Sequence, residues 1–454
     1  MEIYLIAFFI LGYVGITMEH SLKIDKLIPA LLMMVACWTL IAINVDNISY
    51  WIDAESVRSS LAGDHKTRLE IVNKTLLHHF GKTVEILVIM MGAMAIVEMI
   101  EYFDGFSSIK DLIKSRKKTS ILWIVSLIAF LLSSIIYNML ATIVLITILR
   151  KIVSNKEDRM WYSGFIIIAA NAGGCWTPVG DITTTMLWSE HQVFTSSLMW
   201  KLALPSLMCI LLPLIAALFM PVFRGEVELV EDVKVNAKKV NPNSKFMLYF
   251  GLTLIILVPI FETITQLPPY IGMMGALGIF SVVAESLINS KKGKKRIISE
   301  VGVIHQGPTM KALSKVEMPS FLFFLGILMT VAALQSTGMI YNLGEFLNGP
   351  VARNAGVSQD IIVIFLGLAS AIIDNVPLVA ATLGMFKDLP GTDVWYFIAY
   401  AAGTGGSILI IGSAAGVIAM GMEKISFFWY LKNIALLAAL GYFGGIAVFI
   451  LFRN

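Results

Sequence analysis

Three acidic residues, Glu98, Asp181 and Asp374, lie inside long apolar stretches of the sequence. A charged side chain within a membrane segment is costly, and such residues usually face a cavity and mark an ion or proton pathway. A carboxylate kept from water holds its proton more tightly, whereas a nearby cation favours the ionised form. A carboxylate in such a place can therefore take a proton and a small cation in turn, which is the basic chemistry of an antiporter.

Asp181 follows a glycine- and proline-rich stretch that begins at Asn171 and should interrupt a helix. Proline removes a backbone donor and glycine weakens the helix, so the break leaves backbone carbonyls free. Thr183 and Thr184 add hydroxyl oxygens directly after the acid. Because oxygen ligands suit hard cations, the segment predicts a cation site. The alternative is that Asp181 and Asp374 only cap helix breaks.

The apolar region 119–149 is too long for one comfortable span, and basic clusters flank both of its ends. Because Lys and Arg favour the cytoplasmic side, both ends should lie there. The region therefore predicts a re-entrant hairpin with its tip near Asn138, where protein or a watery cavity surrounds the exposed backbone. The alternative, one tilted helix, would place the basic loops at 224–245 and 291–296 on the wrong side.

The sequence contains an internal repeat. NAGGCWTPVGDITT at 171–184 aligns with GTGGSILIIGSAAG at 403–416, and IIYNMLA at 135–141 aligns with IIDNVPL at 372–378. The offsets are 232 and 237 residues, in the same order along the chain. Two copies of one structural unit are therefore expected, and both hairpin tips should meet both broken helices.

The number of crossings between the two copies is odd, so the second copy should be inverted. The predicted crossings are 83–103, 162–188, 198–222, 246–264 and 271–288. Region 361–386 then becomes a second hairpin that enters from outside, with Asp374 and Asn375 at its tip. Inverted repeats with broken helices around a site at mid-membrane are typical of secondary transporters.

The composition indicates the same class. Of 454 residues, 57% are hydrophobic and 14% are charged, against about 25% charged in soluble domains. The predicted fold is an all-α polytopic membrane protein with two inverted repeats, each with a re-entrant hairpin and a broken transmembrane helix, and with both termini outside. The expected parts are N-terminal transmembrane helices and an external loop at 1–82, repeat 1 at 83–222, connecting helices and loops at 223–318, and repeat 2 at 319–454.

Several other functions lack their motifs. The sequence has no HExxH, GxSxG or GxxxxGK[ST] motif, and its three cysteines have unrelated spacings. We therefore expect no enzyme, no ATP-driven pump and no cofactor beyond the transported ions. An intramembrane enzyme would need Asp181 and Asp374 to face each other as a dyad, and a receptor would carry no flux.

The segments NAGGCWTPVGDITTTMLW at 171–188, GAMAIVE around Glu98 and SAIIDNVPLVA around Asp374 closely resemble the NhaD type of sodium/proton antiporter, within the ion transporter superfamily. The resemblance implies exchange of Na⁺, often also Li⁺, for H⁺ across a prokaryotic plasma (inner) membrane. It also implies a homodimer that works as an elevator.

Carried onto this sequence, the resemblance implies a cation and proton site, to which we add Glu98 as a weaker candidate that could instead be interfacial. The residues are Asn138, Asn171, Asp181, Thr183, Thr184, Ser370, Asp374, Asn375, Ser407, Ser413 and Glu98, with Na⁺ expected at Asp181, Asn138, Asn375 and Asp374. One departure is Tyr137, which stands where the family has an acid before Asn138. The rival interpretations are a sodium-coupled carboxylate symporter and an oxyanion exporter of the same fold, although no buried Lys or Arg awaits an anion.

Overall fold

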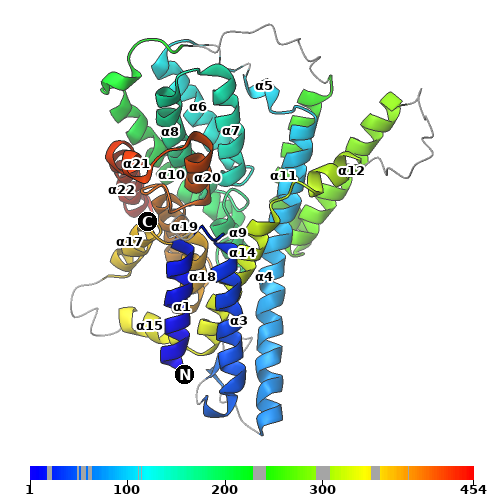
Figure 1. The fold of residues 1–454 in the computed structure, drawn as a ribbon, viewed down its shortest axis with the longest axis vertical. Coiled ribbons are helices and arrows are strands. Elements are labelled where there is room, and N and C mark those ends of the chain that lie inside the picture. The colour runs from blue at the N-terminus through cyan, green and yellow to red at the C-terminus, as the bar shows by residue number, and fades with distance from the viewer. Residues whose placement is uncertain are drawn as a thin grey trace.

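The structure, a computed structural model, describes residues 1–17, 23–48, 51–52, 58–59, 64–110, 112–113, 115–228, 242–292, 307–348, 358–386 and 388–453. These residues are almost entirely helical (Figure 1), with one short antiparallel pair of strands, β1 (Trp51–Ile52) and β2 (Arg58–Ser59). Six of the described helices are long and apolar enough to cross a membrane. They are α4 (His65–Tyr102), α10 (Thr195–Ala217), α11 (Ser244–Thr265), α12 (Pro269–Lys292), α14 (Met318–Ser336) and α22 (Ala435–Phe452).

The first repeat contains the predicted hairpin and the predicted break. Helices α6 (Lys118–Ser133) and α7 (Asn138–Ile152) form the hairpin, and α8 (Lys156–Gly174) and α9 (Ile182–Ser189) form the broken helix. Helix α8 packs against both arms of the hairpin. The hairpin predicted at 119–149 and the interrupted helix that ends before Asp181 are thus confirmed.

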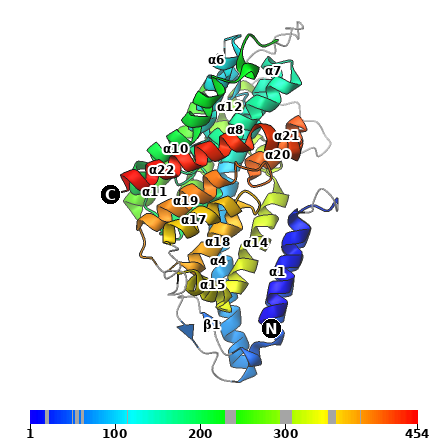
Figure 2. The same ribbon diagram turned by 90° about the vertical axis from the view of Figure 1, so that its left-hand side faces the viewer.

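The second repeat has the same four parts. Its hairpin consists of α17 (Gln359–Ala369) and α18 (Asn375–Met385), and its broken helix consists of α19 (Asp393–Gly405) and α20 (Ala414–Glu423). In Figures 1 and 2 the α6–α7 hairpin lies at the end of the molecule far from the N-terminus, and α17 and α18 lie nearer to it. The predicted fold class is therefore confirmed.

Two glycines at equivalent positions let each broken helix approach its own hairpin closely. A Cβ atom added to Gly173 would lie 2.1 Å from the carbonyl oxygen of Phe130, and one added to Gly405 would lie 2.0 Å from that of Gly367. Gly173 and Gly405 are offset by 232 residues, and Phe130 and Gly367 by 237. The sequence alignment therefore corresponds to the same packing contact in both repeats.

A charged cluster ties the first repeat to the second. Glu423 at the end of α20 is buried and accepts hydrogen bonds from Arg150 Nε of α7 at 2.6 Å and from Arg159 Nε of α8 at 3.1 Å. Removing one side of a buried ion pair leaves an uncompensated charge, which is strongly destabilising. This cluster therefore holds the hairpin of repeat 1 against the broken helix of repeat 2.

A layer of helices, which includes α4 and α14, stands beside the hairpins and broken helices. Helices α1 (Glu2–Thr17) and α3 (Leu27–Ile43) pack on each other, and α3 and α4 pack on α14. Trp38 Nε1 of α3 donates to the carbonyl of Met329 in α14 at 2.8 Å. The remaining short helices are η1 (Val45–Asn47), α5 (Ser107–Lys110), η2 (Pro221–Phe223), α13 (Pro308–Leu313), α15 (Met339–Asn348) and α21 (Phe427–Asn433).

Two predicted boundaries are wrong. The span expected to start at 83 is part of α4, which starts at His65, because Asp64 caps the helix by accepting a hydrogen bond from the backbone of Thr67 at 3.1 Å. The first part of α4, before residue 83, is polar, so hydropathy did not indicate that the helix begins there. The apolar sequence near the C-terminus also predicts one span over residues 427–452, and this segment is divided at Ile434 into α21 and α22.

Parts of the predicted sidedness fall on residues that the structure does not describe. The basic loop predicted at 224–245 is described only at its two ends, and the loop predicted at 291–296 only at residues 291 and 292. Arg353, expected outside, also lies beyond the described residues.

Candidate functional site

Four helices, α7, α9, α18 and α20, begin at the centre of the paired repeats. A predicted site residue is either the N-cap or the first helical residue of each. Asp181 is the N-cap of α9 and accepts a hydrogen bond from the backbone N–H of Thr183 at 3.2 Å. Asp374 is the N-cap of α18 and accepts from the backbone N–H of Val376 at 3.3 Å. Ser413 is the N-cap of α20. A helix N-terminus carries a partial positive charge, so it stabilises a carboxylate placed there.

Asp181 is the centre of a hydrogen-bond network that joins both repeats. Its Oδ2 atom accepts from Asn138 Nδ2 of α7 at 3.0 Å and from Asn375 Nδ2 of α18 at 3.2 Å. Asn138 Nδ2 also lies 3.0 Å from Asn171 Oδ1 of α8, and Asn171 Nδ2 donates to Ser413 Oγ at 3.0 Å. Side chains from both hairpins and both broken helices thus belong to one hydrogen-bond network centred on Asp181.

The surroundings of Asp181 are dry. Its exposed fraction is 1%, and Asn171, Thr183 and Thr184 have none. Thr184 Oγ1 donates to the backbone carbonyl of Asp181 at 2.9 Å, whereas the Thr183 hydroxyl has no hydrogen-bond partner in the part of the chain that the structure describes. The donors to the Asp181 carboxylate are neutral. An ionised carboxylate at this depth needs a compensating charge, so the site suits a proton or a small cation.

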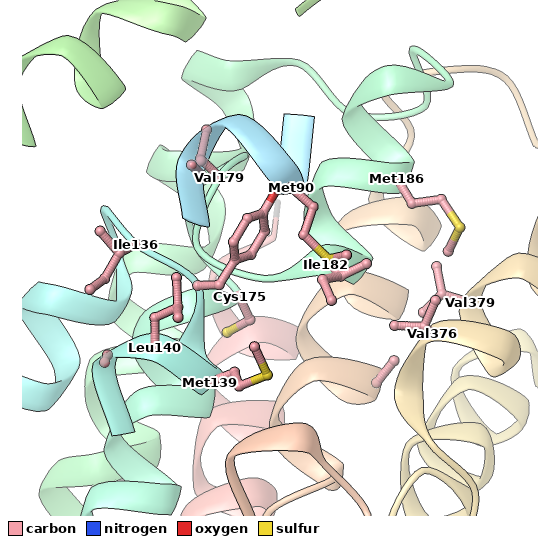
Figure 3. Packing of buried hydrophobic residues seen from close by; sticks show 14 of the residues in the cluster. Met90, Ile136, Met139, Leu140, Cys175, Val179, Ile182, Met186, Val376 and Val379 are labelled. Carbon is pink, nitrogen blue, oxygen red and sulfur yellow. The ribbon is translucent and has the colours of Figure 1, made fainter. Parts of the chain in front are cut away.

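The helices that carry this network also contribute buried apolar side chains. Figure 3 shows Met186 of α9 opposite Val376 and Val379 of α18, with Met90 of α4 and Met139 of α7 nearby. All five side chains are buried. Buried apolar surroundings lower the local dielectric, and this strengthens the interaction between a carboxylate and a cation.

Asp374 lies close to this network but faces a different space. Its side chain lines a cavity of about 100 Å³ together with Lys26, Tyr13 of α1 and Phe323 of α14. Within the described ranges, no hydrogen bond joins the carboxyl groups of Asp374 and Asp181. The two acids therefore do not form the closed dyad that an intramembrane enzyme would need.

Two of the predicted serines satisfy backbone groups at the helix breaks. Ser370 Oγ donates to the carbonyl of Ala402 at 2.8 Å, and Ser407 Oγ donates to the carbonyl of Thr404 at 2.6 Å. Neither has a recorded hydrogen bond to the Asp181 network. Their role in the structure is to join or shape the broken helix of repeat 2.

Glu98 lies apart from the other predicted site residues. It is three-quarters buried near the end of α4, and its Oε2 atom lies 3.6 Å from Nζ of Lys315, which follows α13. None of its recorded ion pairs or hydrogen bonds involves the Asp181 network. Glu98 was a candidate because it lies within an apolar stretch. In the structure its negative charge is paired with Lys315 from a distant segment.

Sequence reasoning overlooked Ser133, the repeat counterpart of Ser370. Ser133 Oγ donates to the carbonyl of Ala170 at 2.6 Å, which matches the bond from Ser370 to Ala402. The signal was present, because the hairpin offset of 237 and the broken-helix offset of 232 relate the two pairs. Applying both offsets to every polar residue would have found it.

Inverted repeats, re-entrant hairpins and broken helices around a buried polar site define a multi-span membrane transport protein. The chain belongs to the citrate transporter family, CitMHS, which matches residues 13–390. It is 36% identical to sodium/proton antiporter 1 of Arabidopsis thaliana, over 98% of this chain and 71% of that protein. It is 27% identical to the Na⁺/H⁺ antiporter NhaD of Vibrio cholerae, over 93% of this chain and 86% of that protein. The resemblance to NhaD-type proteins is thus confirmed.

A solved structure supports the fold independently. The crystal structure of the YdaH transporter from Alcanivorax borkumensis superposes with a TM-score of 0.60, covering 93% of this chain and 98% of that chain. The sequence identity is 13%, so the likeness concerns the fold alone.

Proposed function

We propose that the protein exchanges Na⁺ for H⁺ across its membrane, with Asp181 as the carboxylate that takes the two ions in turn. The observation that carries the proposal is the setting of Asp181, which is 1% exposed and bonded by neutral donors from both repeats. The Arabidopsis and Vibrio relatives are named as Na⁺/H⁺ antiporters, which supports the choice of ions.

The side-chain amides offer a simple way to exchange the ions. Asn138 and Asn375 both direct an N–H group to Asp181 Oδ2. An amide also carries an acceptor oxygen, so turning either side chain about its last bond would present oxygen to a cation bound at Asp181. The Thr183 hydroxyl, which has no partner among the described residues, supplies another oxygen. Binding of a proton to Asp181 removes the charge that holds the cation.

We include Asp374 in the cation site, as the sequence predicted. Its neighbour Asn375 donates to Asp181, so the two carboxyl groups lie on adjoining elements of one polar centre. The Asp374 carboxylate is reached from the cavity that holds Lys26. A cation that enters this cavity would meet Asp374 first and Asp181 next.

A carboxylate symporter is the second candidate, favoured by the family description and by the four helix N-termini at the site. Helix N-termini are ready-made anion sites. Here, however, Asp181 and Asp374 occupy two of them, and no basic residue bonds to the described Asp181 network. A carboxylate substrate would therefore meet two acids, and the Lys26 ammonium in the Asp374 cavity could balance only one of them, so we place this candidate below the antiporter.

The wider mechanism follows from the fold. We propose alternating access in which the hairpins and broken helices of the two repeats, held together through Glu423, move as a unit against α1, α3, α4 and α14. We further propose a homodimer in a prokaryotic plasma membrane, with the loop that contains Lys26 inside and both termini outside. The basic loops and the NhaD resemblance support these points, and we expect no cofactor besides the transported Na⁺, Li⁺ and H⁺.

Everted membrane vesicles with an imposed pH gradient test the proposal. Addition of Na⁺ should collapse the gradient, and Asp181→Asn or Asp374→Asn should abolish that response. Succinate and citrate should produce no response, whereas the symporter would respond to one of them together with Na⁺. Unchanged Na⁺ exchange in both variants would contradict the proposed site.

A further inference from the structure

The cavity beside the second hairpin pairs one acid with one base. Its lining includes Asp374 and Ile411 of repeat 2, Tyr13 of α1, Phe323 of α14 and Lys26. Among the described lining residues, Lys26 is the basic one and Asp374 is the acidic one. A volume of about 100 Å³ admits several water molecules. A small cation can therefore reach the Asp374 carboxylate here, and it would do so in the presence of the Lys26 ammonium.

The position of Lys26 calls for nearby negative charge. Lys26 is the N-cap residue of α3 and makes no side-chain capping hydrogen bond. The positive end of a helix dipole disfavours a cation at this position. Its Nζ atom lies 4.5 Å from the centroid of the Phe323 ring, a cation–π contact, and the Asp374 carboxylate attracts it. Two groups on other elements thus compensate for its unfavourable location.

Lys26 and Asp374 interact without being locked together. Both are among the described residues, and no ion pair within 4.0 Å joins them. Both side chains line the same cavity. A cation arriving at Asp374 can therefore displace this interaction without breaking a direct salt bridge.

The first hairpin also borders a cavity, but other elements, among them α10 and α11, contribute to its lining. A cavity of about 290 Å³ lies beside the first hairpin and is lined by residues that include Ser134, Thr177 and Thr195. Its lining contains no charged residue among those the structure describes. At this hairpin tip the counterpart of Asp374 is Tyr137. Among the described lining residues, a basic side chain thus occurs in the cavity that contains the acidic hairpin tip and not in the cavity beside the first hairpin.

We propose that Lys26 is a specificity-determining residue whose ammonium acts as a tethered cation that competes with the transported cation for Asp374. The inference rests on the proposed function. When no cargo is bound, the ammonium stabilises the ionised carboxylate. When a cation arrives, the ammonium yields and stays over the Phe323 ring. Lys26 thereby weakens cation binding at Asp374 and helps the bound cation to be released.

The first test is the Na⁺ concentration that gives half-maximal exchange in everted vesicles, measured at alkaline pH where protons compete least. Lys26→Met keeps the length and apolar contact of the side chain but removes its charge. It should lower this concentration about fivefold, whereas Lys26→Arg should leave it near the wild-type value. The matched control is Lys23→Met, which removes an exposed charge three residues away and should have no such effect.

Chemical rescue separates charge from packing. Lys26→Cys should show the same gain in apparent Na⁺ affinity as Lys26→Met. Treatment with 2-aminoethyl methanethiosulfonate attaches an ammonium group through a disulfide and should restore the wild-type value. The uncharged methyl reagent should not. Wild-type protein treated in parallel is the control, since Cys37, Cys175 and Cys209 are buried.

Each outcome has a definite meaning. A half-maximal concentration within twofold of wild type for both Lys26→Met and Lys26→Cys overturns the inference, as does equal rescue by the charged and uncharged reagents. If wild-type vesicles exchange Na⁺ normally in that case, the proposed function stands and only the role of Lys26 fails. Vesicles in which wild-type protein shows no response to Na⁺ overturn both.

Discussion

The two repeats share a backbone but carry their acids at different positions. In repeat 1 the acid is Asp181, the N-cap after the helix break, and its counterpart in repeat 2 is Ser413. In repeat 2 the acid is Asp374, at the hairpin tip, and its counterpart in repeat 1 is Tyr137. The paired glycines and serines that shape the breaks are the same in both. Each repeat therefore places one acid at a helix N-terminus. Repeat 1 uses the helix after the break, and repeat 2 uses the second helix of the hairpin.

The surroundings of the two acids differ as well. Asp181 is enclosed by neutral donors from both repeats, whereas Asp374 borders a cavity and faces Lys26. The enclosed acid suits the step in which proton and cation replace each other. The acid beside the cavity suits the step in which the cation enters or leaves. Asp181 is therefore expected to act mainly in ion binding, and Asp374 mainly in entry and exit of the cation.

The largest effect is expected at the enclosed acid. Asp181→Asn removes the charge at the centre of the network while preserving its shape, so Na⁺ binding and exchange should both fall by at least about 100-fold. Binding can be measured as Na⁺-dependent protection against thermal unfolding. The control is Asp104→Asn, which makes the same chemical change at an exposed residue with positive φ that asparagine tolerates. If Na⁺ protected the Asp181→Asn variant against thermal unfolding at the same concentrations as the wild-type protein, Asp181 would not be the main binding residue.

The acid beside the cavity should behave differently. Asp374→Asn should abolish exchange, but Na⁺ protection against unfolding should weaken only about tenfold, because Asp181 and its amides are still present. Exchange and thermal protection measured on the same preparation test this. Equal losses of protection in the Asp181 and Asp374 variants would show that the two acids form a single inseparable site.

The shared backbone predicts equal damage in both repeats. Gly173→Ala and Gly405→Ala each place a methyl group on a carbonyl oxygen that cannot retreat far, so each should destabilise by about 1–3 kcal/mol or prevent folding. The yield of monodisperse protein and its unfolding temperature measure the effect. Gly275→Ala in α12, where an added Cβ meets no atom within 4 Å, is the control and should fold normally. A tolerated alanine at either break would refute the close packing described there.

The smallest effect is expected at the equivalent serines. Ser133→Ala and Ser370→Ala each remove one buried hydrogen bond to a carbonyl at the broken helix, which should cost about 1 kcal/mol apiece. The unfolding temperature should drop by a similar amount in both variants. Because neither serine bonds to the Asp181 network, the half-maximal Na⁺ concentration should stay unchanged. A selective change in that concentration for Ser370→Ala would return this residue to the ion site.

Much of the architecture was predictable, because it depends on local and periodic features. Basic clusters at both ends of 119–149 indicated a hairpin, and glycines with a proline before Asp181 indicated a helix break. The repeat offsets then placed Asn138, Asp181 and Asn375 near one another. These features can be read from the sequence because charge clusters, helix-breaking residues and repeated motifs are local patterns of residue types.

Other features were not predictable, since they depend on contacts between distant segments. The role of Lys26 requires the start of α3 to lie beside a hairpin tip more than three hundred residues away in sequence. The placement of Glu98 depends on Lys315 from another distant segment. The start of α4 at His65 depends on a cap at Asp64 within a polar region, where hydropathy gives no signal.

The central claim is that a proton and Na⁺ replace each other at Asp181. Isothermal titration of the purified protein with Na⁺, repeated in buffers with different ionisation enthalpies, measures the protons released as Na⁺ binds. At a pH where the cation-free site holds its proton, wild-type protein should release protons on binding, and Asp181→Asn should neither bind Na⁺ tightly nor release protons. Na⁺ binding with no proton release at any pH, or unchanged release in Asp181→Asn, would contradict the account.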